Sequence, residues 1–174
     1  MNEEDLLRFV WVADPQISPD GARVAFTRVT IDAEADAYRT SLWLADVPAA
    51  KATPAPPRPL TFGPRDAQPR WSPDGTQLAF VRAGAEKEDK PQLHVLAMAG
   101  GEARALTTLA QGASEPAWSP DGKRIAFLSG TNPDKDAPEV KKPKNEPGRI
   151  VTQPEWRWNN EGFIDPDHLS HLWV

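Results

Sequence analysis

Short runs of apolar residues recur along the chain, and polar turns separate them. Three of these turns carry the same phrase, Ser-Pro-Asp-Gly, which follows Ile or Trp and precedes, after two more residues, an aliphatic residue, Ala and Phe. Ser suits the first position of a tight turn, Pro the second, and Gly the fourth, where a positive φ is tolerated. The bulky residues on both sides predict three hairpins. The turn residues are Ser18, Pro19, Asp20 and Gly21; Ser72, Pro73, Asp74 and Gly75; and Ser119, Pro120, Asp121 and Gly122.

The phrase recurs with a spacing that indicates a repeated structural unit. Its serines are 54 and 47 residues apart, and further strand candidates follow the first two turns, at 41–47 and 58–61 and at 92–98 and 103–107. Repeats of this length bury their faces only by stacking on neighbouring repeats. Four strands in each unit are typical of a blade of a β-propeller.

We therefore predict an all-β fold, a partial β-propeller of about two complete four-stranded blades plus part of a third. In the third unit a long insertion separates the hairpin from the next strand-like stretch at 168–174. Residues 171–174 match the place of 41–44, so the chain ends inside a strand, and we expect it to be the amino-terminal piece of a longer protein. The predicted divisions are a lead-in at 1–12 with a helix over 2–10, a first blade at 13–66, a second blade at 67–113, and an incomplete third blade at 114–174 with an insertion at 130–167.

Composition and charge agree with this fold class and exclude some functions. Nineteen prolines, eleven glycines and seven tryptophans favour turns and strands over long helices. The net charge of −5 provides no broad basic surface, so a nucleic-acid partner is not expected. The absence of cysteine excludes disulfides and thiolate metal sites. The acidic first residues are not followed by a long apolar run, which predicts no secretory signal, no membrane span and a cytoplasmic location.

The sequence contains no complete catalytic motif. The nearest approach to G-x-S-x-G lies at 112–116 and lacks the final glycine. The serines of the three turns are interpreted as turn residues rather than nucleophiles. His168 and His171 have a metal-like spacing beside Asp165 and Asp167, but a further ligand pair is not evident, so neither a metal nor a cofactor is predicted.

The tryptophans divide into two groups. Those at repeat positions, Trp43, Trp71, Trp118 and Trp173, are predicted to lie in the core. Trp156 and Trp158 lie outside the repeat, beside Arg149, Arg157 and Glu161. A pocket or interface there is the alternative to a packed insertion, because a charge at such a place could bind a peptide terminus.

Several segments resemble the propeller domain of prolyl oligopeptidase family serine peptidases, most closely the acylaminoacyl peptidase branch. They are 14–21 with 24–26, the Trp-Ser-Pro-Asp-Gly repeats, and 158–163 with 171–174. The resemblance implies a propeller that admits short peptides to a carboxy-terminal α/β-hydrolase domain with a Ser, Asp and His triad. That domain is absent from this chain, which would then contain no catalytic residue. The resemblance implies no cofactor, and Arg149, Arg157 and Glu161 are the residues that we expect at the substrate chamber or domain interface.

Two other interpretations stay open. A non-catalytic, WD40-like propeller of the kind found in the Tol system has similar repeats and binds partner proteins. A stand-alone module could instead cover its open sheet face by forming a homo-oligomer. A G-x-S-x-G motif followed by Asp and His in the remaining reading frame would favour the peptidase.

Overall fold

The strands of this chain are grouped around the three turns. The structure is a computed structural model that describes residues 3–49, 52–63, 65–86, 89–136, 157–158, 162–163 and 165–174. The first unit contains β1 (Val10–Ile17), β2 (Arg23–Asp32), β3 (Ala37–Asp46) and β4 (Arg58–Pro59). The second contains β5 (Arg65–Trp71), β6 (Gln77–Ala83), β7 (Gln92–Ala97) and β8 (Arg104–Ala105). The third contains β9 (Ser114–Trp118), β10 (Ile125–Ser129) and β13 (His171–Trp173). The remaining elements are α1 (Glu3–Leu6), β11 (Arg157–Trp158), β12 (Gly162–Phe163) and the 3-10 helix η1 (Pro166–His168).

Each unit is an antiparallel meander in which successive strands pair in chain order. β1 pairs with β2, β2 with β3 and β3 with β4, and the second unit repeats this order from β5 to β8. In the third unit β10 lies between β9 and β13. The register repeats as well, since Trp43 is opposite Phe26 and Trp173 is opposite Phe127. The all-β, partial-propeller prediction is confirmed.

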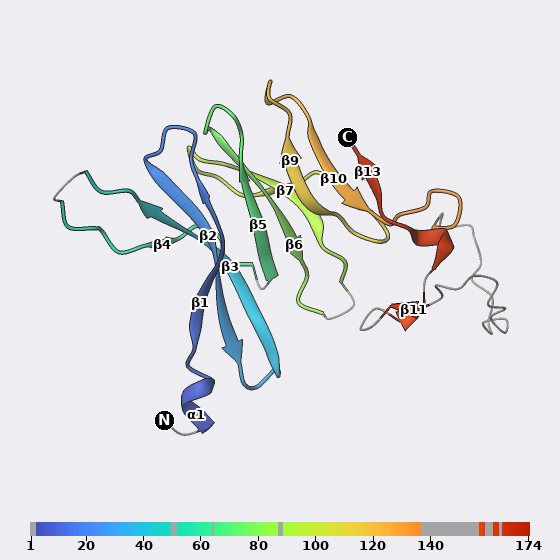
Figure 1. The fold of residues 1–174 in the computed structure, drawn as a ribbon, viewed down its shortest axis with the longest axis horizontal. Coiled ribbons are helices and arrows are strands. Elements are labelled where there is room, and N and C mark those ends of the chain that lie inside the picture. Colours follow the sequence, from blue (N-terminus) through green and yellow to red (C-terminus); the bar gives the residue numbers. More distant parts are fainter. Residues whose placement is uncertain are drawn as a thin grey trace.

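The three Ser-Pro-Asp-Gly turns lie side by side, along the upper edge of the molecule in Figure 1. In each, the serine hydroxyl donates to the aspartate two residues on and accepts from the backbone amide five residues on. The turn glycines have φ values near +70°, which only glycine adopts readily. A Cβ on Gly75 would come 3.5 Å from Cδ of Pro19, and one on Gly122 would come 3.6 Å from Cδ of Pro73.

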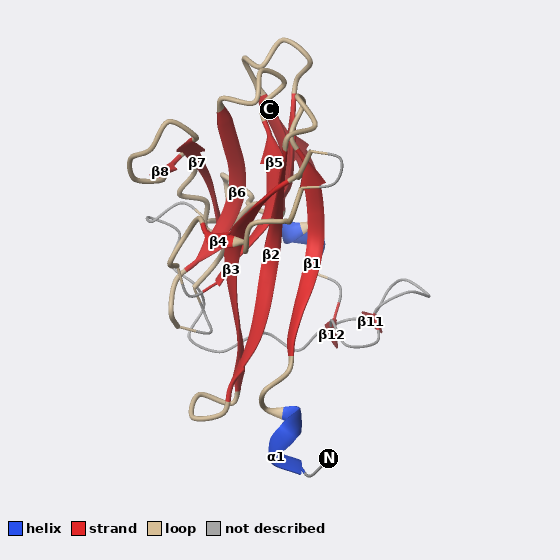
Figure 2. Cartoon of the chain, turned by 90° about the vertical axis from the view of Figure 1, so that its left-hand side faces the viewer, coloured by secondary structure: helices blue, strands red, loops and turns tan. Residues whose placement is uncertain are grey.

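The core consists of two apolar layers, one between each pair of neighbouring units. The first layer joins Leu42 and Leu44 of β3 to Leu78 and Phe80 of β6. The second joins Leu93 and Val95 of β7 to Phe127 of β10. The second unit therefore buries one face of its sheet against the first unit and the other face against the third. Figure 2, turned by 90°, shows the long strands running side by side through the molecule.

The amino-terminal lead-in differs from its prediction. The helix covers only Glu3–Leu6, and Val10 already belongs to β1, where it lies opposite Thr30. The helix predicted over 2–10 is therefore wrong beyond Leu6, because the chain turns there and the last residue of that range, Val10, pairs with β2 instead. β11 and β12 form a small separate hairpin inside the segment predicted as an insertion.

Candidate functional site

A strained backbone position recurs on the first strand of every unit. Asp14, Gln68 and Glu115 all have positive φ, at +47°, +56° and +52°. All three stand four residues before the serine of their turn. The ladder is irregular at each of them, with register shifts in the β1–β2, β5–β6 and β9–β10 pairs. Non-glycine residues rarely adopt positive φ, and such strain is concentrated at functional sites.

The local sequence explains the irregular ladder. Each strained residue precedes a proline, at Pro15, Pro69 and Pro116. Proline has no N–H to donate to the ladder, so it is typical of a bulge in a strand. Pro69 and Pro116 are fully buried, whereas Pro15 of the first unit is exposed. The repeated motif is thus longer than Ser-Pro-Asp-Gly and includes the three or four residues before it.

The polar side chains beside these bulges join neighbouring units. Arg70 donates from Nη1 to Oδ2 of Asp14 at 2.6 Å, and both side chains are partly buried. Gln16 donates to the other oxygen of Asp14 at 2.8 Å. Gln68 donates to Oε1 of Glu115 at 2.9 Å and accepts from the Glu115 backbone amide at 2.8 Å. We call Asp14, Gln16, Gln68, Arg70 and Glu115 the first-strand row.

Two tryptophans tie the units together next to this row. Trp71 donates from Nε1 to the Gln16 carbonyl, and Trp118 donates to the Arg70 carbonyl, each at 3.0 Å. The acceptors are equivalent, because each precedes the serine of its own turn by two residues. The Arg23 guanidinium also lies over the Trp71 ring, 5.0 Å from its centre.

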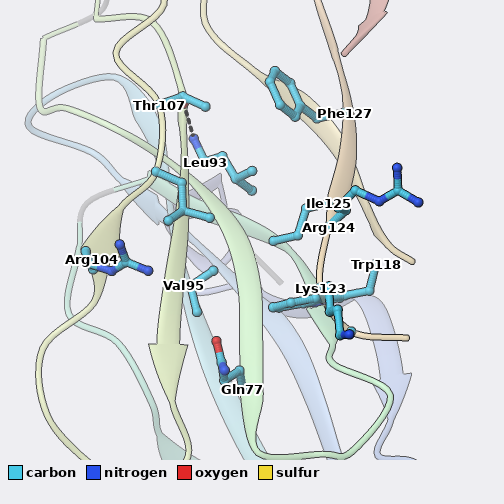
Figure 3. A pocket seen from close by; sticks show the side chains of 12 residues that line it. Gln77, Leu93, Val95, Arg104, Thr107, Trp118, Lys123, Arg124, Ile125 and Phe127 are labelled. Atoms are coloured by element: carbon cyan, nitrogen blue, oxygen red, sulfur yellow. Dashed lines mark hydrogen bonds between the residues drawn. The ribbon is translucent and has the colours of Figure 1, made fainter. Parts of the chain in front are cut away.

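A cleft of about 350 Å³ lies between the second and third units (Figure 3). Its floor is apolar, with Leu93 and Val95 on one side and Ile125 and Phe127 on the other. Gln77 lies at the position that Arg23 has in the first unit. The residue at this position is therefore an amide beside Trp118, where Trp71 has a guanidinium over its ring. The charged residues that line the cleft are all basic: Arg104, Lys123 and Arg124.

A buried ion pair lies near the other end of β5. Asp66 is fully buried, and Arg82, directly opposite on β6, donates to both of its carboxylate oxygens at 2.6 and 2.8 Å. The hydrogen bond to Asp66 raises the pKa of Arg82. The pair locks the register of β5 against β6, and a permanently charged guanidinium of this kind is suited to structure rather than proton transfer.

The predicted site residues fall mostly outside the part of the chain that the structure describes. Arg149 and Glu161 are outside the described residues, and for Arg157 only the backbone position in β11 is described. His168 contacts two aspartates, whereas His171 is exposed on β13. Within the described ranges, no group of His, Asp and Glu side chains is arranged to hold a metal ion.

The predicted core tryptophans are buried to different extents. Trp71 is 9% exposed, as predicted, while Trp43, Trp118 and Trp173 are half-buried. Trp156 lies outside the described residues. The sequence prediction missed the first-strand row, although the proline repeat before each turn was a signal for it.

Comparisons with known proteins agree with this fold. No family model matches the chain. Over 113 residues the chain is 40% identical to the uncharacterized peptidase YuxL of Bacillus subtilis, a match that covers 64% of this chain and 16% of that protein. It also resembles an acylaminoacyl peptidase in complex with Z-Gly-Gly-Phe-chloromethyl ketone, with a TM-score of 0.67, 17% identity and coverage of 93% of this chain and 22% of that one.

One of the similar structures is itself named as a β-propeller domain. The β-propeller domain of the Trilobed protease from Pyrococcus furiosus matches with a TM-score of 0.53 and 18% identity, over 70% of this chain and 34% of that one. The fold is that of a partial β-propeller. The resemblance to the propeller portion of prolyl oligopeptidase family peptidases is confirmed.

The chain spans about a sixth of the curated relative that it matches. TolB from Acinetobacter baumannii also matches, with a TM-score of 0.50 and 21% identity over 68% of this chain and 26% of that one. None of the helices in the described residues is long and apolar enough to cross a membrane.

Proposed function

We propose that this chain is the amino-terminal part of the propeller of a cytoplasmic serine exopeptidase similar to acylaminoacyl peptidases. In this proposal the propeller limits the access of peptides to a catalytic domain outside residues 1–174. The observation that carries the proposal is the 40% identity with a peptidase over 113 residues. The partners of the chain are then the rest of the parent polypeptide and a short peptide substrate.

The first-strand row would supply polar groups to the wall of the access route. Propeller blades are arranged around a central channel, and the first strands of successive units contact one another here. The row contains one ion pair, a further carboxylate and two amides but no activated nucleophile, so its chemistry suits binding and exclusion. Bond cleavage would occur at an activated serine and an oxyanion hole in the catalytic domain.

Arg149, Arg157 and Glu161 remain our proposed contacts of the chamber or the domain interface. A guanidinium there would pair with a peptide carboxylate. In the parent enzyme, Arg157→Glu should then change the KM for short peptides, whereas Arg8→Glu on the exposed lead-in should leave it unchanged. Equal kinetics of the two variants and the parent would remove Arg157 from the proposal.

The gating proposal is tested on the whole parent polypeptide. An N-acetylated short peptide is supplied once as a free molecule and once as the amino-terminal sequence of a stably folded protein. We expect hydrolysis of the free peptide and none of the fused one. Equal hydrolysis of both would contradict gating, and no hydrolysis of either would contradict the peptidase assignment.

A non-catalytic propeller that binds proteins is the second candidate, and the similarity to TolB favours it. The two candidates differ in the remainder of the parent reading frame. A G-x-S-x-G motif followed by Asp and His supports the peptidase, and a propeller without such a segment supports the binding module.

A further inference from the structure

A histidine at the base of the third unit lies between two carboxylates. Nδ1 of His168 is 2.8 Å from Oδ2 of Asp165, and Nε2 is 3.1 Å from Oδ1 of Asp136. Asp165 caps η1, to which His168 itself belongs, while Asp136 ends the turn that follows β10. The imidazole ring therefore connects two elements that are far apart in the sequence.

This geometry suits the charged form of the histidine. Both ring nitrogens face carboxylate oxygens, and only an imidazolium carries a proton on each nitrogen. In the neutral ring one nitrogen would direct its lone pair at an anionic oxygen. The hydrogen bond with Asp165 and then the one with Asp136 raise the pKa of His168.

Asp136 is held in its charged form by other donors. Its side chain is only 6% exposed and accepts from the Asn132 backbone amide at 2.9 Å and from Nε2 of Gln111 at 3.1 Å. The bond from Asn132, followed by those from Gln111 and His168, lowers the pKa of Asp136. When the cationic partner of such a buried carboxylate becomes neutral, the folded state is destabilised, because the carboxylate charge is no longer paired.

The same two elements are held together by contacts that do not depend on His168. Nδ2 of Asn132 donates to the Asp167 carbonyl at 2.9 Å, and Nζ of Lys135 lies 3.8 Å from the Asp167 carboxylate. A Cβ on Gly130 would come 2.7 Å from the His168 carbonyl, so the two backbones are closely apposed. The other titratable groups on these elements, Asp134 and His171, are exposed.

We propose that His168 is a protonation-dependent clasp that holds η1 against the 132–136 turn and thereby fixes β13 on the edge of β10. β13 begins three residues after His168, and its Trp173 stacks on Phe127 with ring centres 6.4 Å apart. Both aromatic residues pack in the apolar layer between the second and third units. The clasp is thus connected through β13 to that layer, and it does not depend on the proposed peptidase function.

The direction of the pH dependence follows from the two pKa shifts. A histidine with a raised pKa contributes stability fully below its ordinary value of 6.5 and loses it as the pH rises through the higher folded-state pKa. Asp136 has a lowered pKa, so its contribution to stability is present above the ordinary value of 3.8 and is lost only as the pH falls below that value. The clasp is therefore closed in mild acid and opens as the pH rises through the raised pKa of His168.

The first test is a titration of the unaltered chain, in which NMR follows the ring resonances of His168. We expect His168 to titrate above the ordinary histidine value of 6.5, because both of its ring nitrogens face carboxylate oxygens. Titration at or below 6.5 would overturn the proposal.

The second test measures hydrogen exchange of the β13 amides across the same pH range, corrected for intrinsic exchange. Protection should fall severalfold as His168 loses its proton, and it should become independent of pH in His168→Gln. His171→Gln is the matched control and should keep the pH dependence of the unaltered chain. A pH dependence that persists in His168→Gln would show that another group controls β13.

Discussion

At the scale of the residue, one indole nitrogen joins the second unit to the first, and another joins the third unit to the second. Trp71 and Trp118 donate to equivalent backbone carbonyls, although they are 47 residues apart in the sequence. The first unit has Ile17 at this position, which has no donor and is 64% exposed. The tryptophan of the repeat therefore serves the contact between units as well as the apolar layer.

Replacing Trp71 by Phe tests this bond. The variant keeps an aromatic ring but leaves the Gln16 carbonyl without this donor, so the free energy of unfolding should fall by about 1–2 kcal/mol. Trp43→Phe is the control, because Trp43 is half-buried and donates only to Ser41 of its own strand. Its loss should be smaller in urea unfolding; a larger loss for Trp43→Phe would contradict the assigned role of Trp71.

At the scale of the element, the repeat places different chemistry at equivalent strand positions. Arg82 on β6 pairs with buried Asp66, whereas the equivalent Arg28 on β2 lies 4.9 Å from the centre of the Trp43 ring. The residue opposite Arg28 on β1 is Val12, so no carboxylate faces it from that strand. Arg82 also lies 5.2 Å from the centre of the Phe80 ring, so the second unit has the Asp66 ion pair in addition to a cation–π contact.

This difference predicts unequal effects of the same substitution. Arg82→Met leaves the Asp66 carboxylate buried without its partner and should lower the free energy of unfolding by about 3 kcal/mol. Arg28→Met removes only a half-buried cation–π contact and should lower it by about 0.5–1 kcal/mol. Urea unfolding of the two variants measures the difference. Equal losses would mean that the Asp66 pair contributes no more than the stacked cation.

The elements that the sequence predicted correctly are those specified by local chemistry. Proline and glycine restrict the backbone of the Ser-Pro-Asp-Gly turns, so the hairpins follow from a few adjacent residues. The helix over 2–10 failed beyond Leu6 because Val10 pairs with Thr30 of β2, a contact between residues distant in the sequence that the spacing of Leu6, Leu7 and Val10 does not reveal. The contact between Asp14 and Arg70 joins residues 56 positions apart and has no local signature.

At the scale of the whole molecule, the units are equivalent in strand order but unequal in how they are covered. Leu42 of β3 and Leu93 of β7 are 0% and 2% exposed, because the next unit packs on each of them. Leu172 occupies the equivalent position in β13 and is 70% exposed. The apolar faces that contain Leu42 and Leu93 are therefore buried by the second and third units and not by the strands of their own unit.

The most direct test of this account compares Leu93→Ala with Leu172→Ala in urea unfolding of this chain. Leu93→Ala should lower the free energy of unfolding by about 2–5 kcal/mol, because it opens a cavity between the second and third units. Leu172→Ala should change it by no more than about 0.5 kcal/mol, since its side chain lies largely in water. Similar losses for both variants would contradict the claim that the units bury their faces only by stacking on one another.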